Sequence, residues 1–423
     1  MKQEEQNSQA VYFKSLTIEG INCFKSEQTI DLTDGEGNPA MWTVILGNNN
    51  TGKTTLLRCL ALLQIDNHAK LPDSTNVPIS EYSDFPNEND QLKSCKVLSE
   101  LTNEEKKFGF KHQYEPQHQI YDMEPISSIL YPISHSTLFK IDAYGTQRKQ
   151  GKGNFLGYKL EDRTESLFED EVESIINAEE WFLGTDYNAL KGGQKFSKNL
   201  EQIKSTLISI LPDIKDIEIN EDGERRVQFI TNGNERVLVN QLGSGYQSLV
   251  TWVVDLAKRM FDRYPESDNP LAEPAIVLVD EIDLHLHPEW QRKIVSFLRG
   301  KFPKTQFIVT AHSPLVIQSA DAINVVVLQK NEETDEVNIY QPKETNFQGW
   351  TVEEILSDLM QMGDNVYSNE YLKWMKQFDE ALDTDDYQKA KEAYEELSKM
   401  VYSSATLKML RIQMSSLMPE SND

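Results

Sequence analysis

The chain has 423 residues, 39 % of them hydrophobic and 26 % charged, which supports a sizeable core and excludes a disordered chain. Its net charge of −26 opposes a surface that wraps nucleic acid, so direct DNA contact would need a local basic patch or a separate partner. Three scattered cysteines, Cys23, Cys59 and Cys95, fit a reducing cytoplasm and argue against disulfide or zinc sites. No apolar run approaches the roughly 20 residues of a membrane span, and residues 1–10 do not resemble a signal peptide. We therefore expect a cytoplasmic protein without membrane contact.

The first half of the chain is predicted to begin with strands. Apolar alternation or short apolar runs predict strands over residues 12–18, 29–32 and 43–46. Leucines at helical spacing then predict a helix over 54–63, and the polar, proline-containing residues 66–89 read as a surface insertion. Further strands are predicted over 96–101, 107–111 and 136–142. Helices are predicted to follow over 165–183 and 200–211.

The second half alternates between strands and helices. Strands are predicted over 214–220, 226–231, 275–279, 306–310, 322–329 and 337–340. Helices are predicted over 246–261 and 290–298. Such an order indicates an α/β fold, with a mostly parallel sheet that helices cover on both faces.

The composition changes after residue 342, where the chain becomes acidic and helical in pattern. One apolar stripe steps by three or four residues through Tyr387, Ala390, Tyr394, Leu397 and Val401. We expect two or three short amphipathic helices here. They either pack on one another or on the sheet, or they form a docking surface for a partner.

The clearest motif is GNNNTGKT at residues 47–54, which matches G-x-x-x-x-G-K-[ST] at every fixed position. An apolar strand is predicted before it and a helix after it, as a phosphate-binding loop requires. Backbone amides and the positive end of the helix would face the phosphates of ATP. Lys53 would reach the β- and γ-phosphates and Thr54 would bind Mg²⁺. The predicted ATP-binding residues are Gly47, Asn48, Asn49, Asn50, Thr51, Gly52, Lys53, Thr54 and Thr55.

A second motif is the apolar run at 275–279, which ends in Asp280 and Glu281. A carboxylate at the end of a buried strand can reach the Mg²⁺ shell, and we assign this role to Asp280. Glu281 follows and can accept a proton from an attacking water. An apolar run before Asp-Glu is weak evidence alone, but it becomes strong beside a phosphate-binding loop.

Two further segments indicate which class of P-loop protein this is. LGSGYQ at 242–247 begins a predicted helix and resembles the ABC signature Leu-Ser-Gly-Gly-Gln, with Ser244, Gly245 and Gln247 matching by position. Gly243 and Tyr246 depart from that pattern. His312 follows another apolar strand and precedes Ser-Pro, where the ABC pattern has a histidine that contacts the γ-phosphate.

Three loop assignments leave alternatives open. His285 and His287 could suggest a metal, but no further ligand cluster accompanies them, and Pro288 suits the start of a helix. Gln147 is either an exposed loop residue or a nucleotide-contacting glutamine. The basic residues Arg148, Lys149 and Lys152 either meet nucleic acid or keep a loop soluble; we favour solubility.

Together these motifs resemble the RecF/SMC/OLD branch of ABC ATPases, over most of residues 12–342. The similarity is greatest to short bacterial ATPases of anti-phage defence, such as the ATPase subunits of Septu and PARIS. It implies a P-loop ABC-ATPase head with a mixed and parallel sheet, followed by a C-terminal helical extension. The expected domains are 1–65 and 213–342 for two parts of the head, 66–212 for an insertion and helical lobe, and 343–423 for an acidic helical tail.

The resemblance implies that ATP and Mg²⁺ bind between two heads, each supplying its P-loop to one site and its signature to the other. Within that scheme Gln147 is the candidate for the glutamine loop, and the loop containing Asp283 and His287 would cross the dimer interface. No long heptad arm and no Toprim nuclease pattern are present, so cutting would fall to a separate effector subunit.

The favoured hypothesis is therefore an ATPase that acts as a homodimer, as the regulatory or sensing subunit of a defence complex with an effector nuclease. Three alternatives remain: a RecF-like repair ATPase that binds DNA directly, an ATP-binding scaffold with little turnover, and a transporter ATPase. The net charge argues against the first of these.

Overall fold

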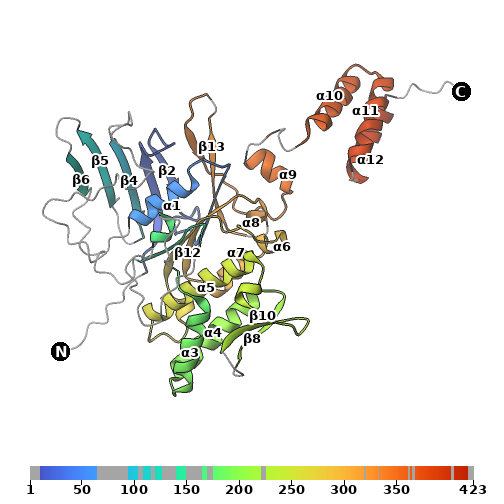
Figure 1. Cartoon of the computed structure of the whole chain (residues 1–423). Helices are drawn as coiled ribbons and strands as arrows, with labels where there is room; N and C mark the ends of the chain where they lie inside the picture. Colours follow the sequence, from blue (N-terminus) through green and yellow to red (C-terminus); the bar gives the residue numbers. More distant parts are fainter. Residues whose placement is uncertain are drawn as a thin grey trace. The chain divides into compact units, whose positions relative to one another are not determined.

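A six-stranded sheet organises the larger part of the computed structural model (Figure 1). Five strands run parallel: β13 (Asn324–Lys330), β3 (Trp42–Gly47), β12 (Thr305–Ala311), β11 (Ala275–Val279) and β7 (Ile141–Tyr144). β14 (Val337–Tyr340) pairs antiparallel with β13 at one edge, and β7 forms the other edge. The central strands β3, β11 and β12 are buried along their whole length, as expected for a sheet covered on both faces.

The structure describes residues 10–63, 94–102, 108–115, 120–125, 140–148, 164–168, 175–220, 225–318, 321–331, 333–360, 363, 367–401 and 404–417. The chain divides into two compact units, Met1–Val352 and Glu353–Asp423. None of the helices in these described ranges combines the length and hydropathy that a bilayer-spanning helix needs.

One face of the central sheet is covered by α1 (Lys53–Leu62) and then by a second, antiparallel sheet. The strand order of this sheet is β2 (Gln28–Asp31), β1 (Phe13–Glu19), β4 (Ser94–Leu101), β5 (Phe108–Glu115) and β6 (Ile120–Pro125). Leu16 of β1, Leu57 of α1 and Ile308 of β12 belong to one buried cluster. The helix that follows the glycine-rich loop is therefore held between two sheets (Figure 1).

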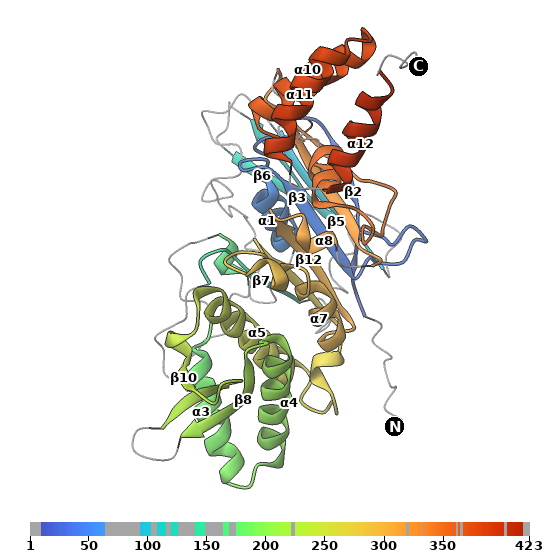
Figure 2. The same cartoon turned by 90° about the vertical axis from the view of Figure 1, so that its right-hand side faces the viewer.

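The opposite face carries α5 (Ser244–Arg263) and a lobe made of two helices and a small sheet (Figure 2). Successive strand residues point to opposite faces. Ile141 and Ala143 of β7 accordingly join the cluster around α1, whereas Tyr144 contacts Trp252 of α5. The lobe contains α3 (Ala178–Leu190), α4 (Gln194–Ile210), β8 (Ile214–Asn220), β9 (Arg226–Thr231) and β10 (Arg236–Leu238).

Buried charges join β7 to α5. Arg263 lies 2.5 Å from an Asp142 oxygen, and Arg259 Nε lies 2.5 Å from an Asp255 oxygen. The Tyr144 hydroxyl donates to the same Asp255 oxygen, Oδ2 (2.9 Å). These charged side chains are at most 4 % exposed. Removing one member of a buried ion pair leaves the other charge without compensation.

Asp255→Ala is therefore expected to lower the free energy of unfolding by about 3–5 kcal/mol, because Arg259 would lose its nearest buried carboxylate. Denaturant titration of the full chain measures this. Asp262→Ala on the same helix is the matched control, because Asp262 pairs with Lys258 at the surface and its loss should cost about 0.5 kcal/mol or less. Equal midpoints for the two variants would contradict the contribution of the buried network.

Most predicted elements are confirmed, and the errors have identifiable causes. The predicted helix over 165–183 is wrong at its beginning, where a 3-10 turn spans Glu165–Leu167 and Ile175 makes a β-bridge. α3 begins only after Asn177, whose side chain accepts a hydrogen bond from the Glu180 amide and caps the helix. The apolar Ile175 and Ile176 are buried before the helix begins, which mimicked a helical pattern.

Other differences concern boundaries. The strand predicted over 136–142 is β7, displaced to Ile141–Tyr144, and residues 136–139 lie outside the described ranges. The helix predicted over 290–298 is two helices, α6 (Pro288–Gln291) and α7 (Ile294–Lys301). β6 and β10 had no predicted counterpart, and the predicted insertion at 66–89 is not described.

Two predicted domain boundaries do not match the packing. α4 packs on β8, so the boundary after residue 212 would cut through the lobe. The second unit begins at Glu353 and not at residue 343. Trp350 stays with the first unit, where its carbonyl accepts a hydrogen bond from Gln318 of α8 (Leu315–Gln318) and its ring packs against Phe347. The remaining boundaries stay predictions.

The second unit is helical, as predicted. A π-helical turn, η5 (Ile355–Leu359), precedes α10 (Asn369–Asp383), α11 (Tyr387–Met400) and α12 (Ser404–Ser415). Ser368 and Asp386 cap α10 and α11 through hydrogen bonds from backbone amides. Ala390 and Leu397 of the predicted stripe are buried in the unit's own core. Packing among these helices therefore accounts for that stripe, and a docking surface on the tail stays a prediction.

Candidate functional site

The glycine-rich loop lies between β3 and α1 and turns back on itself. Gly52 has φ +85°, and a Cβ there would lie 2.6 Å from the Cys23 sulfur, so glycine is required. A Cβ on Gly47 would lie 2.6 Å from Thr51 Oγ1. The Thr51 hydroxyl instead donates to the Asn48 carbonyl (2.9 Å), and Asn50 has φ +61°. Both motif glycines thus have a steric reason to be glycine.

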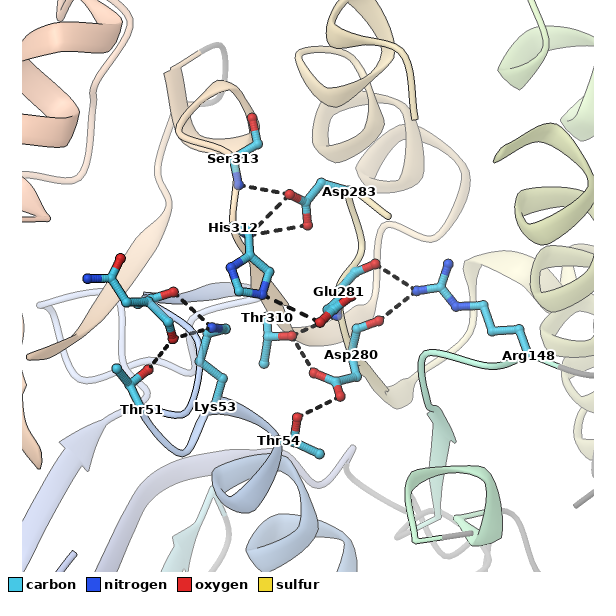
Figure 3. A network of polar contacts seen from close by, with 12 residues as sticks. Thr51, Lys53, Thr54, Arg148, Asp280, Glu281, Asp283, Thr310, His312 and Ser313 are labelled. Carbon is cyan, nitrogen blue, oxygen red and sulfur yellow. Dashed lines mark hydrogen bonds and ion pairs between the residues drawn. The ribbon is translucent and has the colours of Figure 1, made fainter. Parts of the chain in front are cut away.

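Lys53 points into the curve of this loop. Its ammonium donates to the carbonyls of Gly47 and Asn48, both at 2.8 Å (Figure 3). Burial lowers the pKa of Lys53 from its usual value, and the negative charges of Asp280 and Glu281 act in the other direction. A buried cation surrounded by curved backbone is suited to bind a polyanion.

The other loop residues divide into two groups. The side chains at Asn48, Asn49 and Asn50 are exposed, whereas Thr55 is buried and its hydroxyl lies 3.4 Å from the Asn22 amide nitrogen. Thr55 therefore faces the segment after β1.

Thr54 and Asp280 come together at the ends of neighbouring elements. The Thr54 hydroxyl donates to Asp280 Oδ2 (2.7 Å), and the Thr310 hydroxyl donates to Oδ1 (2.5 Å) (Figure 3). No group of three or more His, Cys, Asp or Glu in the described ranges could hold a metal by itself. A pair of oxygen ligands suits Mg²⁺, which usually takes its other ligands from water and substrate phosphates. These two residues fit the predicted magnesium role.

Glu281 and His312 lie side by side. His312 Nε2 is 3.4 Å from Glu281 Oε1, and both side chains are partly exposed. Glu281 has φ +47°, and its amide donates to the Thr310 hydroxyl (2.7 Å). Positive φ in a residue other than glycine is uncommon and often marks a functional site.

Asp283 fixes the loop that carries the histidine. Its carboxylate accepts hydrogen bonds from the amides of His312 (3.1 Å) and Ser313 (2.8 Å) (Figure 3). Asp283 is buried within the single chain, and the crossing of a dimer interface by its loop stays a prediction. His287 caps α6, because its Nδ1 accepts a hydrogen bond from the Glu289 amide (3.4 Å). Pro288 begins that helix, as predicted.

The sequence favoured a basic side chain at Arg148 that keeps a surface loop soluble, and this prediction is wrong. It is 7 % exposed, and one guanidinium nitrogen donates to the carbonyls of Asp280 (2.6 Å) and Glu281 (2.9 Å) (Figure 3). Burial lowers its pKa to about 10, although the charges of Asp280 and Glu281 act against this shift. Lys149 and Lys152 lie outside the described residues. The sequence did not reveal these two contacts of Arg148, because no motif marks a backbone carbonyl as a partner.

Helix α5 begins at Ser244, the residue matched to the signature serine. Gln247 donates from its side chain to the Leu242 carbonyl (2.6 Å) and so closes the turn before the helix. Tyr246, which departs from the signature pattern, donates to Asp213 (2.9 Å) and packs edge-on against Trp290. Burial and the Asp213 hydrogen bond raise the pKa of Tyr246 to about 12. It remains a neutral donor at physiological pH.

A polar cavity of about 700 Å³ links these segments. Gln147, Glu281 and Ser244 all line it, together with Thr146, Arg148, Asn177, Glu179, Val239, Asn240, Gln247, Ser248, Thr251, Leu284 and His285. Gln147 therefore lies in the same cavity as the candidate base. Its nucleotide-contacting role stays a prediction.

Gly245 is packed against the loop after Glu281. A Cβ at this position would lie 2.3 Å from the His285 carbonyl oxygen. Gly245→Ala should therefore shift α5 or that loop and lower the free energy of unfolding by about 1–3 kcal/mol. Urea titration measures the change. Gly300→Ala in α7 is the control, since nothing lies within 4 Å of its Cβ and it should not destabilise the chain. A Gly245→Ala variant as stable as this control would contradict the steric argument.

Comparison with known proteins agrees with the motifs. The sequence model of the family described as "AAA domain, putative AbiEii toxin, Type IV TA system" matches residues 42–318. "Septu protein PtuA" of Bacillus thuringiensis is 34 % identical over 189 residues, which are 44 % of this chain and 48 % of that protein. "Retron Vc95 probable ATPase" of Vibrio cholerae serotype O1 biovar El Tor is 28 % identical over 431 residues, covering 84 % of this chain and 81 % of that one. The chain thus spans less than half the length of the Septu relative and most of the retron relative.

Among solved structures, the SMC head bound to the C-winged helix domain of ScpA aligns with a TM-score of 0.48 at 14 % identity. That alignment covers 78 % of this chain and 97 % of the SMC chain. The predicted resemblance to a Septu ATPase subunit is confirmed by the sequence relatives.

Proposed function

This chain belongs to the AAA-domain family whose sequence model matches residues 42–318, and from that premise we propose that it binds and hydrolyses Mg·ATP between two copies of its head. One observation carries the proposal. The Asp280 carboxylate accepts hydrogen bonds from the hydroxyls of Thr54 (2.7 Å) and Thr310 (2.5 Å), directly beside the loop that contains Lys53. A phosphate-binding loop and a carboxylate at a strand end are the parts that a P-loop ATPase brings together.

Phosphate binding would begin with an exchange of partners at Lys53. Its bonds to the carbonyls of Gly47 and Asn48 would give way to bonds with β- and γ-phosphate oxygens. The loop amides and the N-terminus of α1 supply further donors. Thr54 and Asp280 would hold Mg²⁺, which neutralises charge on the phosphates when bound.

Hydrolysis requires a water that is held in line with the γ-phosphorus. Glu281 is the candidate base and would accept the proton of this water as its oxygen bonds to phosphorus and the bond to ADP breaks. Thr310 and Arg148 hold the backbone on either side of the Glu281 carboxylate. His312 lies 3.4 Å from that carboxylate and would contact the γ-phosphate.

Each site would be completed by a second copy. In the ABC pattern a signature serine and helix N-terminus meet the γ-phosphate from the opposite subunit, and Ser244 at the first turn of α5 suits this role. Gln147 would contact the nucleotide from the same chain as the P-loop.

The biological role that we propose follows from the relatives, whose printed names assign them to Septu and retron systems. We propose a regulatory or sensing ATPase subunit in the cytoplasm that acts with a separate effector nuclease. Co-expression with the products of adjacent genes, followed by purification through this chain, tests that part. A stable complex with a nuclease supports it, and repeated recovery of a homodimer alone contradicts it.

The enzymatic proposal is tested by phosphate release from ATP. The purified chain should release phosphate with Mg²⁺ present and stop when the metal is chelated, and light scattering should detect a dimer that requires ATP. Phosphate release that is unaffected by chelation, or ATP binding without any change in mass, would contradict the metal and dimer assignments respectively.

A further inference from the structure

Arg148 connects three parts of the head that the proposed cycle needs. It follows Gln147 at the end of the β7 segment. Its guanidinium donates to the carbonyls of Asp280 and Glu281 and, through a second nitrogen, to the Ser248 hydroxyl of α5 (2.9 Å). Its Nε donates to the Gly145 carbonyl (3.2 Å). Every guanidinium nitrogen therefore has a partner, and the three nitrogens bond to three different segments.

The signature helix is also joined to β7 at a second place. The buried contacts among Asp142, Asp255, Arg259 and Arg263 hold the C-terminal half of α5 against that strand. Because these charges would be costly to separate, β7 and α5 should move as one body. Ser248 lies only four residues from Ser244, so its bond to Arg148 acts near the end of α5 that carries the signature.

Three residues with positive φ meet around the same cavity. They are Arg148 (+42°), Glu281 (+47°) and His285 (+60°). Residues other than glycine rarely adopt a positive φ, and they keep it where surrounding contacts determine the backbone conformation. A change at the Glu281 peptide would alter the bonds that Arg148 makes, and through Ser248 it would reach α5.

We propose that Arg148 is a positioning residue that couples the catalytic turn of one nucleotide site to the signature helix serving the opposite site. The inference rests on the proposed ATPase dimer and adds a physical link between its two sites. It assigns no chemical step to Arg148. The guanidinium sets the position of the Glu281 backbone and of the first turns of α5 relative to each other.

Two variants test the link while keeping the chain folded. Ser248→Ala removes one hydrogen bond and leaves the bonds from Arg148 to the carbonyls of Asp280, Glu281 and Gly145. Arg148→Lys keeps the positive charge but cannot reproduce the four bonds. Ser209→Ala is the matched control, because this hydroxyl on α4 bonds only to carbonyls of its own helix.

Five quantities are compared for the full-length chain: the affinity for a fluorescent ATP analogue, kcat and KM for ATP hydrolysis, the ATP-dependent dimer mass at several protein concentrations, and Tm. Both variants should keep analogue affinity within about twofold and lower kcat by about five- to tenfold, the size of a modest coupling energy. ATP-dependent dimer formation by both variants should require a higher protein concentration than that of the wild type. The control should match the wild type.

Two outcomes would overturn the coupling role. One is a Ser248→Ala chain whose kcat and dimerisation equal those of the wild type. The other is a fall in kcat that is accompanied by a comparable fold-loss of analogue affinity and by a lower Tm, since that pattern indicates a purely structural contact. If the wild type binds ATP without turnover, hydrolysis itself fails as a proposal, and the ATP-dependent dimer of Ser248→Ala alone decides the coupling.

Discussion

Glu281→Gln is expected to lower kcat for ATP hydrolysis by about 100-fold or more while ATP binding is retained. The substitution keeps the shape of the side chain but removes the carboxylate that would accept a proton from the attacking water. The backbone at this position is held by Thr310 and Arg148, so the variant should fold like the wild type. Phosphate release at saturating ATP measures the loss, and binding of a fluorescent ATP analogue measures what remains.

The same variant should accumulate as an ATP-bound dimer, because closure would proceed and hydrolysis would not. Glu289→Gln is the matched control, since Glu289 of α6 forms an exposed ion pair with Lys293 and its substitution should leave turnover unchanged. Turnover that survives Glu281→Gln would exclude this carboxylate as the base. It would also favour the alternative of an ATP-binding scaffold, in which hydrolysis has little importance.

Lys53→Met is expected to weaken ATP binding by about 100-fold, because charge-assisted hydrogen bonds to two phosphates contribute about 3 kcal/mol together. The uncharged side chain also removes the two bonds that now hold the loop carbonyls of Gly47 and Asn48. Calorimetric titration with ATP and Mg²⁺ measures the affinity, and thermal unfolding without nucleotide separates lost binding from lost structure.

Lys195→Met serves as the control for removing one positive charge, because Lys195 is exposed on α4. It should bind ATP like the wild type. An affinity for Lys53→Met that equals the control would mean that the loop does not hold the phosphates, and the assignment of residues 47–54 would then be wrong.

The parts of the site that were predicted from sequence share one physical property. Their chemistry depends on residues that are adjacent in the chain: a loop between a strand and a helix at 47–54, or a carboxylate directly after a buried strand at Asp280. Glycine at 47 and 52 and the apolar run at 275–279 therefore indicated geometry without any tertiary information. The central strands were predicted for the same reason, since strands buried on both faces are continuously apolar.

The contacts that the sequence did not predict involve partners that are far away in the chain. Arg148 bonds to carbonyls more than 130 residues later, and backbone carbonyls carry no sequence signal. Asp283 is turned inward by the amides of His312 and Ser313, which the sequence had not connected to it. The first turn of α3 was placed too early because Ile175 and Ile176 are apolar for reasons of burial.

From the sequence by itself, the family was predicted by resemblance, and the glycine-rich loop, the carboxylates at the end of β11 and the helical character of the C-terminal unit were predicted from local patterns. The loop, the carboxylates and the helices follow from local spacing and periodicity. Only the tertiary structure decided that β7 and α5 are joined by buried charges, that Arg148 bridges the turn at Asp280 and Glu281 to Ser248, and that Gln147 shares a cavity with Glu281. The reason is that strand order and helix packing bring these groups together, and a buried polar group takes its partners from whatever the fold places beside it.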